Sequence, residues 1–185
     1  MELTDCIIGR RAIRSYQDKQ VKKEMADAIL DAGIWAPSGV NEQPWNFIII
    51  EDAKTIKRLS SKVKEILLEY EWSMQYKAAL ESEMDTIFYG APLLVIICVE
   101  KDEEWHTIRS IDCGLASQNM MLKAYDLGLG SCFIGFGNYL NEDADTKQSI
   151  GVPEGHQILS CMIFGHPGEE PEAKERELKL INWIK

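Results

Sequence analysis

Asp112–Phe136 reads DCGLASQNMMLKAYDLGLGSCFIGF, and its two halves predict different structures. The first half is rich in helix-forming residues, and apolar side chains are spread around most of the helical circumference. These apolar positions are Ile111, Leu115, Met120, Met121, Leu122, Ala124, Tyr125 and Leu127. A surface helix has one apolar stripe, whereas a helix that is apolar nearly all round is buried. The sequence therefore predicts a buried central helix.

The second half of this stretch is rich in glycine. Four glycines surround the short run Ser131–Ile134: Gly128, Gly130, Gly135 and Gly137. Glycine lets the backbone turn sharply or approach a ligand closely, so a strand and loop here can face a flat ligand with main-chain amides. A buried helix, a glycine stop and an ordinary strand explain the same residues. This stretch alone does not decide between the two interpretations.

Length and composition predict one domain over residues 1–185, because a chain of this size buries a core without cross-links. Its 45% hydrophobic and 27% charged residues are ordinary for a soluble globular protein. The net charge of −10 disfavours nucleic acid and anionic membrane surfaces as partners. The N-terminus lacks the apolar core of a signal peptide. The longest apolar run, Ala91–Val99, is too short to span a membrane.

The cysteine pattern favours a reduced, cytoplasmic protein. There are five cysteines, an odd number: Cys6, Cys98, Cys113, Cys132 and Cys161. None forms a C-x-x-C pair, and none has zinc-site spacing to a histidine. Cys98 and Cys161 fall in apolar, strand-like runs, where a reduced cysteine behaves as a small hydrophobe. We therefore expect no metal site.

Hydrophobic periodicity and breaker residues predict the remaining elements. Helices are expected over Leu3–Gly9, Val21–Trp35, Lys54–Tyr70, Trp72–Tyr89 and Glu142–Ile150. Buried strands are expected over Asn46–Ile50, Leu93–Val99 and His156–Gly165. Leu178–Ile184 alternates weakly, like an edge strand, and has no obvious partner in its own chain.

Two further motifs carry candidate ligand-binding groups. Arg10, Arg11 and Arg14 place three guanidinium groups within five residues of an acidic chain, and arginine's planar fork suits phosphate or carboxylate. A solvated basic turn is the alternative. The loop Ala36–Trp45 reads APSGVNEQPW; its two prolines stiffen it, and its neutral polar side chains can bind a heterocycle without adding charge. A simple polar connector is the alternative here.

Together these motifs resemble the nitroreductase-like flavoprotein family in its short form. The resemblance covers nearly the whole chain, in the family's order: Arg10–Arg14, Ala36–Phe47, Asp112–Leu122, Gly128–Gly135 and the basic pair Lys174 and Arg176. It implies an α+β fold with a mixed, mainly antiparallel sheet flanked by helices, in an intertwined homodimer with exchanged C-terminal strands. Two FMN molecules would lie at the dimer interface, each bound by both chains.

The resemblance also implies roles for individual residues. Five basic residues would hold the FMN phosphate and ribityl chain: Arg10, Arg11, Arg14, Lys174 and Arg176. Four residues of the partner chain would meet the flavin from the other side: Pro37, Ser38, Gly39 and Asn41. The backbone N–H groups of Ile134 and Gly135 would lie near flavin N5. Trp105 is a candidate substrate contact, with packing as the alternative. Ala12 and Gly39 depart from the family pattern, because serine is common at both positions.

The function implied is an FMN-dependent NAD(P)H oxidoreductase with a ping-pong mechanism. NADH or NADPH would reduce the flavin, and a nitroaromatic, quinone or similar small acceptor would then reoxidise it. No side chain is required as a general acid or base, so no catalytic residue is predicted. A non-catalytic FMN-binding sensor or storage protein is one alternative. A second alternative is another chemistry of the superfamily, such as flavin fragmentation or reductive dehalogenation. A third is a domain that binds no cofactor.

Overall fold

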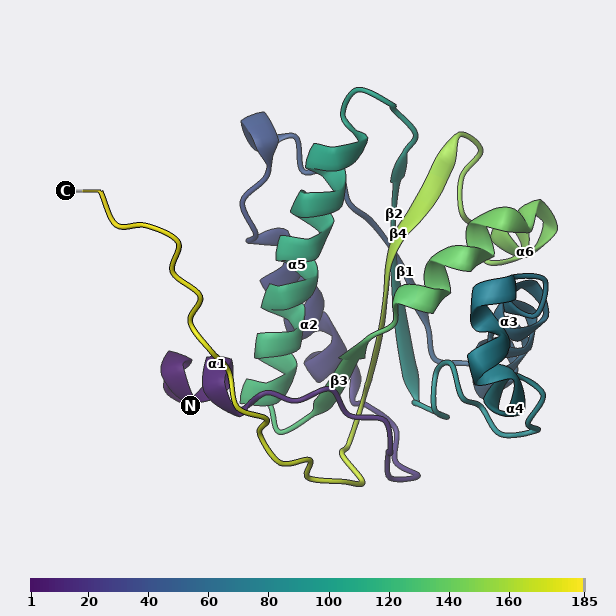
Figure 1. The fold of residues 1–185 in the computed structure, drawn as a ribbon, viewed down its shortest axis with the longest axis horizontal. Coiled ribbons are helices and arrows are strands. Elements are labelled where there is room, and N and C mark those ends of the chain that lie inside the picture. The colour runs from purple at the N-terminus through teal and green to yellow at the C-terminus, as the bar shows by residue number, and fades with distance from the viewer. Residues whose placement is uncertain (185) are drawn as a thin grey trace.

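The computed structural model describes residues 1–184 as one four-stranded antiparallel sheet between two layers of helices (Figure 1). The strands are β1 (Asn46–Ile50), β2 (Leu93–Glu100), β3 (Gly130–Phe133) and β4 (His156–Gly165), in the order β1-β2-β4-β3. The predicted α+β fold is confirmed. The only parallel pairing among the described residues is an isolated bridge between Ala12 and Ser131.

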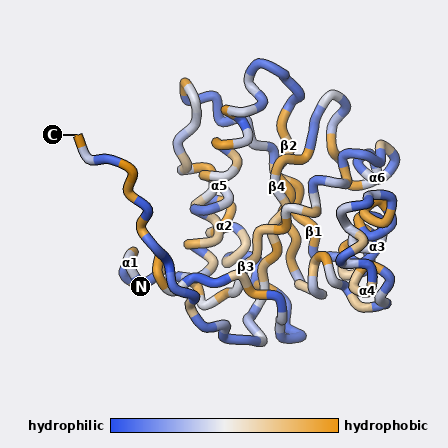
Figure 2. Tube along the Cα trace, viewed as in Figure 1, coloured by the Kyte–Doolittle hydropathy of each residue, from blue (hydrophilic) through white to orange (hydrophobic). Residues whose placement is uncertain are grey.

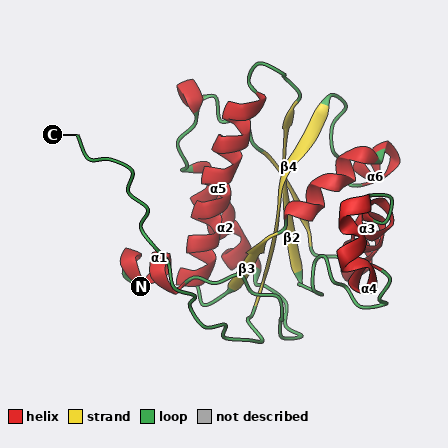
Figure 3. Cartoon of the chain, viewed as in Figure 1, coloured by secondary structure: helices red, strands yellow, loops and turns green. Residues whose placement is uncertain are grey.

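Helices cover both faces of the sheet (Figure 3). One layer contains α2 (Lys23–Ile34) and α5 (His106–Asp126), with α1 (Leu3–Gly9) beside the C-terminal end of α5. The other layer contains α3 (Ala53–Leu67), α4 (Lys77–Leu80) and α6 (Ala144–Ser149). Three 3₁₀ segments complete the fold: η1 (Gly39–Asn41), η2 (Glu71–Tyr76) and η3 (Gly135–Glu142).

The sequence of β2 explains why both faces of the sheet are covered. Its residues from Leu93 to Val99 are all buried, and successive side chains of a strand point to opposite faces. One set packs with α3: Leu94, Ile96 and Cys98. The other set packs with α5: Leu93, Val95, Ile97 and Val99. A strand buried on both sides reads as a continuous apolar run, and Figure 2 shows the apolar residues concentrated in the strands between the layers.

The central helix α5 starts before Asp112, at His106, and only one of its faces is buried in the single chain. Met120 and Ala124 are fully enclosed against the sheet and α2. On the opposite face Ile108, Ile111 and Leu115 remain exposed, Ile111 with 57% of its surface. The predicted burial of this helix is therefore incomplete within one chain, and burial of its open face against the matching helix of a partner chain stays a prediction. An apolar helix face left open in this way is typical of a protein interface.

The predicted helix over Trp72–Tyr89 is only partly correct, because helical structure ends at Leu80. The chain forms η2 and the single turn α4 and then leaves helical geometry before Asp85. The Asp85 carboxylate accepts N–H groups from three following residues: Ile87, Phe88 and Gly90. Lys64 donates from α3 to backbone carbonyl groups of the same segment, at Ser82 and Met84. Such side-chain bonds give the backbone an alternative to helical pairing.

The C-terminal segment forms no strand within residues 169–184 and runs away from the sheet (Figure 3). Its apolar side chains are exposed: Leu178, Leu180, Ile181, Trp183 and Ile184. The predicted edge strand is therefore not formed within one chain, and strand exchange with a partner stays a prediction. In the described part of the chain, no helix is long and apolar enough to span a membrane.

Candidate functional site

The arginine turn lies along β3. The Ile13 N–H group donates to the Ser131 carbonyl oxygen at 3.0 Å, next to the bridge between Ala12 and Ser131. This pairing fixes the backbone of residues 12 and 13 against the sheet edge. It brings Arg10 and Arg11 to the end of α5 where the C-terminal segment passes (Figure 1). Two segments from opposite ends of the sequence thus become neighbours.

These two segments line an open cavity of about 640 Å³. Four of the five basic residues singled out by the sequence line it: Arg10, Arg11, Lys174 and Arg176. The polar side chain of Gln118 lines it from α5. The structure therefore brings the early arginines and the late basic pair together, although more than 160 residues separate them in the chain.

The cavity has a net positive charge, because four basic side chains and one acidic side chain, Glu172, line it. Among residues 1–184, none of its four basic side chains takes part in an ion pair. Arg10 Nε is buried and has no hydrogen-bond partner in the described chain. Burial, followed by the neighbouring charges of Arg176 and Arg11, lowers the pKa of Arg10. Buried donors and uncompensated charge are costly, so this cavity suits an anionic ligand.

The three arginines of the turn differ in their contacts and in their position relative to the cavity. The Arg11 guanidinium donates to the carbonyl oxygens of Ile8 at 2.6 Å and Arg10 at 2.7 Å, so it also stabilises the turn itself. Arg14 does not line the cavity. Its Cζ atom lies 6.0 Å from the centre of the Tyr89 ring. Arg10 is thus the member of the turn whose donors are best placed for a ligand.

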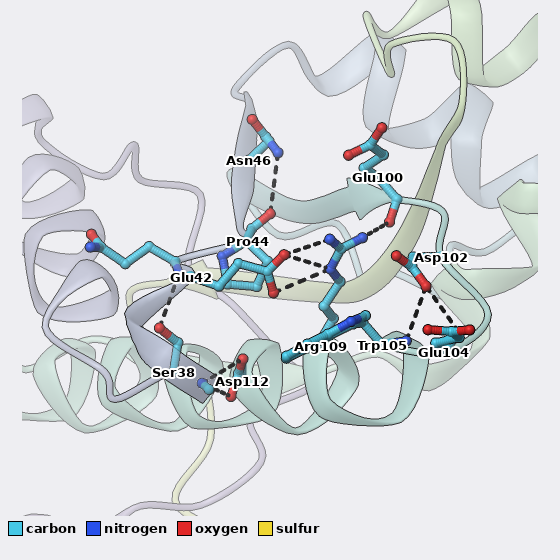
Figure 4. Close-up of polar contacts among 12 residues, drawn as sticks. Ser38, Glu42, Pro44, Asn46, Glu100, Asp102, Glu104, Trp105, Arg109 and Asp112 are labelled. Atoms are coloured by element: carbon cyan, nitrogen blue, oxygen red, sulfur yellow. Dashed lines mark hydrogen bonds and ion pairs between the residues drawn. The ribbon is translucent and has the colours of Figure 1, made fainter.

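The loop with Pro37, Ser38, Gly39 and Asn41 lies at the other end of α5 (Figure 1). Gly39 N–H donates to Asp112 near the start of the helix (Figure 4). The arginine turn, in contrast, is next to the helix end at Tyr125. No residue of the loop lines the cavity, which meets α5 at Gln118. One chain therefore does not bring the two halves of the predicted site together, and supply of the loop by a partner stays a prediction.

The amides of Ile134 and Gly135 differ. Ile134 N–H donates to the Cys161 carbonyl oxygen at 2.8 Å, so this amide continues the pairing of β3 with β4. The prediction that it faces a ligand needs correction for that reason. Gly135 N–H has no acceptor among the described residues, and Gly135 is exposed at the start of η3. Only the Gly135 amide is free to donate.

Trp105 is half-buried at the start of α5, and its backbone N–H group donates to the Asp102 carboxylate at 3.1 Å (Figure 4). Its ring lies close to Gly39, 3.9 Å from the position that a Cβ atom would take there. It therefore belongs to the loop end of α5. Its role as a substrate contact stays a prediction.

Sequence reasoning missed an aromatic cluster beside Gly135. The cluster consists of Tyr70, Trp72, Tyr76, Phe136 and Tyr139. Trp72 lies over Phe136 with 5.9 Å between ring centres, and Trp72, Tyr76 and Phe136 are exposed. The aromatic residues between positions 70 and 76 are apparent in the sequence. Their convergence on η3 was not predicted, because a continuous helix was expected from Trp72 to Tyr89. Exposed aromatic rings next to a free amide can stack on a planar ligand.

Comparison with known proteins shows the family to which this fold belongs. The nitroreductase family matches residues 7–166. The chain belongs to the nitroreductase family. It is 30% identical over 176 residues to a Methanothermobacter thermautotrophicus protein provisionally named NADH dehydrogenase/NAD(P)H nitroreductase, covering 95% of this chain and 82% of that one. It is 28% identical over 174 residues to the NADPH-flavin oxidoreductase of Vibrio harveyi, covering 93% of this chain and 68% of that one.

Among solved structures, a nitroreductase of Bacteroides fragilis with bound FMN superimposes with a TM-score of 0.87. It is 30% identical, and the match covers 100% of both chains. Nitroreductase-family membership makes the departure at Gly39 informative. A Cβ atom there would lie 2.8 Å from Ile108 Cγ2, so a serine would force Ile108 to shift. In this member of the family the side chain of Ile108 takes the space that serine would need.

Proposed function

We propose that the protein is an FMN-dependent NAD(P)H oxidoreductase that reduces a nitroaromatic, quinone or similar small acceptor by a ping-pong mechanism. The observation that carries this proposal is the cavity that joins Arg10 and Arg11 to Lys174 and Arg176. Its unpaired cations match the phosphate of FMN, and the similar Bacteroides fragilis nitroreductase binds FMN. A location in the cytoplasm stays a prediction from composition.

In this proposal Arg10 and Arg176 bind the phosphate, with support from Arg11 and Lys174. The buried Arg10 Nε atom, which lacks a protein acceptor, fits this role because phosphate oxygen supplies one. Arg14 is placed further along β3, so we assign it to the ribityl chain rather than to the phosphate. The exposed Gly135 amide is the candidate donor to flavin N5.

The second half of the site comes from a second copy of the chain. No residue of the loop 37–41 lines the cavity of its own chain, and the exposed face of α5 with Ile111 and Leu115 suits an apolar contact. In a homodimer formed through α5, Ser38 and Asn41 of one chain would meet the flavin held by the other. The exposed C-terminal segment would then pack on the partner.

Bound FMN supplies the redox chemistry, because it accepts a hydride from NADH or NADPH and returns electrons to the acceptor. The chain's own part is to bind and orient. The Gly135 N–H group offers a fixed donor that does not titrate. Trp72 and Phe136, next to it, offer apolar rings on which a planar acceptor or nicotinamide can stack. No general acid or base is assigned.

An absorption spectrum of the purified protein, followed by anaerobic mixing with NADH or NADPH, tests this function. We expect a yellow protein whose flavin absorbance bleaches with at least one nucleotide and returns when a quinone or nitroaromatic is added. A yellow protein inert to both nucleotides would instead indicate a binding or storage role. A colourless protein that does not take up FMN would contradict the proposal entirely.

Asn41→Gly is expected to weaken FMN binding several-fold. Asn41 has a φ of 59°, so alanine would add backbone strain, whereas glycine removes the side chain and keeps the left-handed conformation. The loss then reports the missing hydrogen bonds to the flavin rather than a distorted loop. Fluorescence titration of the apoprotein with FMN measures it. Gln43→Gly, also left-handed with a φ of 51°, is the matched control; equal affinities of wild type and Asn41→Gly would remove Asn41 from the site.

A further inference from the structure

The loop of residues 38–43 has an unusual backbone. Three of its non-glycine residues lie in the left-handed region, with φ values of 48° at Val40, 59° at Asn41 and 51° at Gln43. A β-branched residue such as Val40 rarely adopts this conformation, and it persists only where surrounding contacts enforce it. The Val40 side chain is 85% exposed, so packing within the chain does not compensate for the strain.

The first contact that enforces this backbone is an ion pair to α5 (Figure 4). Arg109, only 9% exposed, donates from Nε to the two carboxylate oxygens of Glu42 at 3.0 and 3.3 Å. Its Nη2 atom reaches the same carboxylate, and Nη1 donates to the Glu100 carbonyl oxygen at 2.8 Å. The guanidinium group thus ties the loop to both α5 and the end of β2.

The second contact comes from the next turn of α5. Asp112 is 4% exposed, and its two carboxylate oxygens lie 3.3 and 3.1 Å from the Gly39 amide nitrogen, which donates to them. Inside the loop, Ser38 Oγ accepts the Gln43 N–H group at 3.0 Å. Gly39 and Glu42 are therefore fixed to the helix on either side of the strained pair Val40 and Asn41.

This connection between α2 and β1 has a higher free-energy cost than an ordinary turn. Burying Arg109 and Asp112 costs desolvation that an ordinary turn would avoid, and the ion pair of Arg109 with the partly exposed Glu42 is weak evidence of added stability. Left-handed non-glycine residues add strain, and such residues cluster at ligand clamps. What the contacts do achieve is a fixed presentation of Ser38 and Asn41. A binding loop held in its bound conformation loses less entropy when its ligand arrives.

We propose that Arg109 and Asp112 are positioning residues of the flavin site. From α5 they hold residues 38–43 in the left-handed conformation, so that Ser38 and Asn41 are presented to the FMN bound by the partner chain. Neither residue touches the flavin. The proposal rests on the proposed function, because it requires an FMN site shared by two chains. It adds that the affinity of one chain's flavin depends on an ion pair inside the other chain.

The test compares FMN affinity in Arg109→Gln, Arg109→Lys and Glu42→Gln with that of the wild-type dimer. We expect Arg109→Gln to raise the dissociation constant about tenfold. Arg109→Lys keeps the charge but not the fork, so it should lie between Arg109→Gln and wild type. The double variant with Glu42→Gln should bind no more weakly than Arg109→Gln alone, because the two side chains act as one unit. Arg58→Gln is the matched control, because Arg58 lies on α3 and loses only one hydrogen bond, to Ser149 on α6.

Mixed dimers give a readout that a merely structural role would not change. A dimer of one Arg109→Gln chain and one Arg10→Ala chain contains one site with an intact Arg10 and an intact loop. We expect that mixed dimer to regain one high-affinity FMN, whereas both parent variants have none. No regained site would show that Arg109 acts within its own chain, which overturns the proposal.

Two other results are decisive. Unchanged FMN affinity in Arg109→Gln, with a lowered thermal midpoint, would assign the ion pair to stability alone and overturn the proposal while leaving the proposed function intact. A wild-type protein that does not bind FMN would overturn both. Because Glu42→Gln removes the ion pair without a change of shape, it supplies the affinity measurement if Arg109→Gln does not fold.

Discussion

Arg10→Ala is expected to raise the dissociation constant of FMN by about 10- to 100-fold. A hydrogen bond to a charged group contributes about 1.5–3 kcal/mol, and 1.4 kcal/mol corresponds to a factor of ten. Arg10 is the basic residue of the cavity with a buried, unpartnered donor atom, so its removal leaves the phosphate without its best-placed contact. Fluorescence titration of the apoprotein measures the loss. The double variant with Arg10→Ala and Arg176→Ala should bind FMN more weakly still.

The effect of Arg10→Ala on the apoprotein distinguishes binding from structure. Arg10 lies near Arg176 and Arg11, whose charges, together with burial, lower the pKa of its guanidinium group. Without an anion these cations repel one another, so removing one should not destabilise the empty protein. We expect the thermal midpoint of the apoprotein to stay within about 2 °C of wild type, whereas the FMN-loaded midpoint falls.

Arg58→Ala is the control, since Arg58 lies on α3, across the sheet from the cavity. It should change neither FMN affinity nor the difference between apo and loaded midpoints. If Arg10→Ala destabilises the apoprotein and leaves FMN affinity unchanged, the arginine turn is structural and the cavity is not the phosphate site. High salt should weaken wild-type binding more than binding by the variant, because fewer charges remain to be screened.

The parts of the fold that the sequence predicted are those with local or strongly apolar signals. The bounds of Leu3–Gly9, Asn46–Ile50 and His156–Gly165 match the structure, because each is a periodic or apolar run closed by a turn. The segment after Leu80 was mispredicted as helix. Its course depends on Asp85 and on contacts from α3, which no local pattern reveals.

In the candidate site too, some features could be predicted from the sequence and others could not. The cluster of Arg10 with Arg176 could be predicted because arginine in an acidic chain is conspicuous and the family motif supplies the pairing. The left-handed backbone at Val40 could not be predicted, because valine disfavours that region and tertiary contacts with Arg109 and Asp112 hold the loop. Likewise, the pairing of the Ile134 amide with Cys161 depends on strand register. Tertiary contacts decide these details.

Ile111→Glu is expected to convert the protein from dimer to monomer at micromolar concentration and to abolish tight FMN binding. Ile111 lies between Ile108 and Leu115 on the exposed apolar face of α5, and in the proposed dimer this face is buried. An unpaired carboxylate buried there costs several kcal/mol, enough to reduce association by about a thousandfold. Analytical ultracentrifugation measures the oligomeric state, and fluorescence titration measures the flavin affinity.

Met84→Glu is the matched control, because it also places an acid at an exposed apolar position, but near α3 on the other side of the sheet. It should leave dimer and flavin unchanged. An Ile111→Glu protein that remains dimeric would show that this face is not the interface. A monomeric variant that keeps wild-type FMN affinity would show that one chain suffices, and would remove the loop of residues 37–41 from the site.

The loss of both properties in one variant follows from linkage. If each flavin contacts two chains, FMN binds the dimer better than the monomer and must strengthen association by the same factor. Adding FMN to dilute wild-type apoprotein should therefore increase the dimer fraction. It should do so much less in Arg10→Ala, whose α5 face is intact but whose flavin affinity is reduced. If FMN does not change the dimer fraction of the wild-type chain, the site is not shared between two chains.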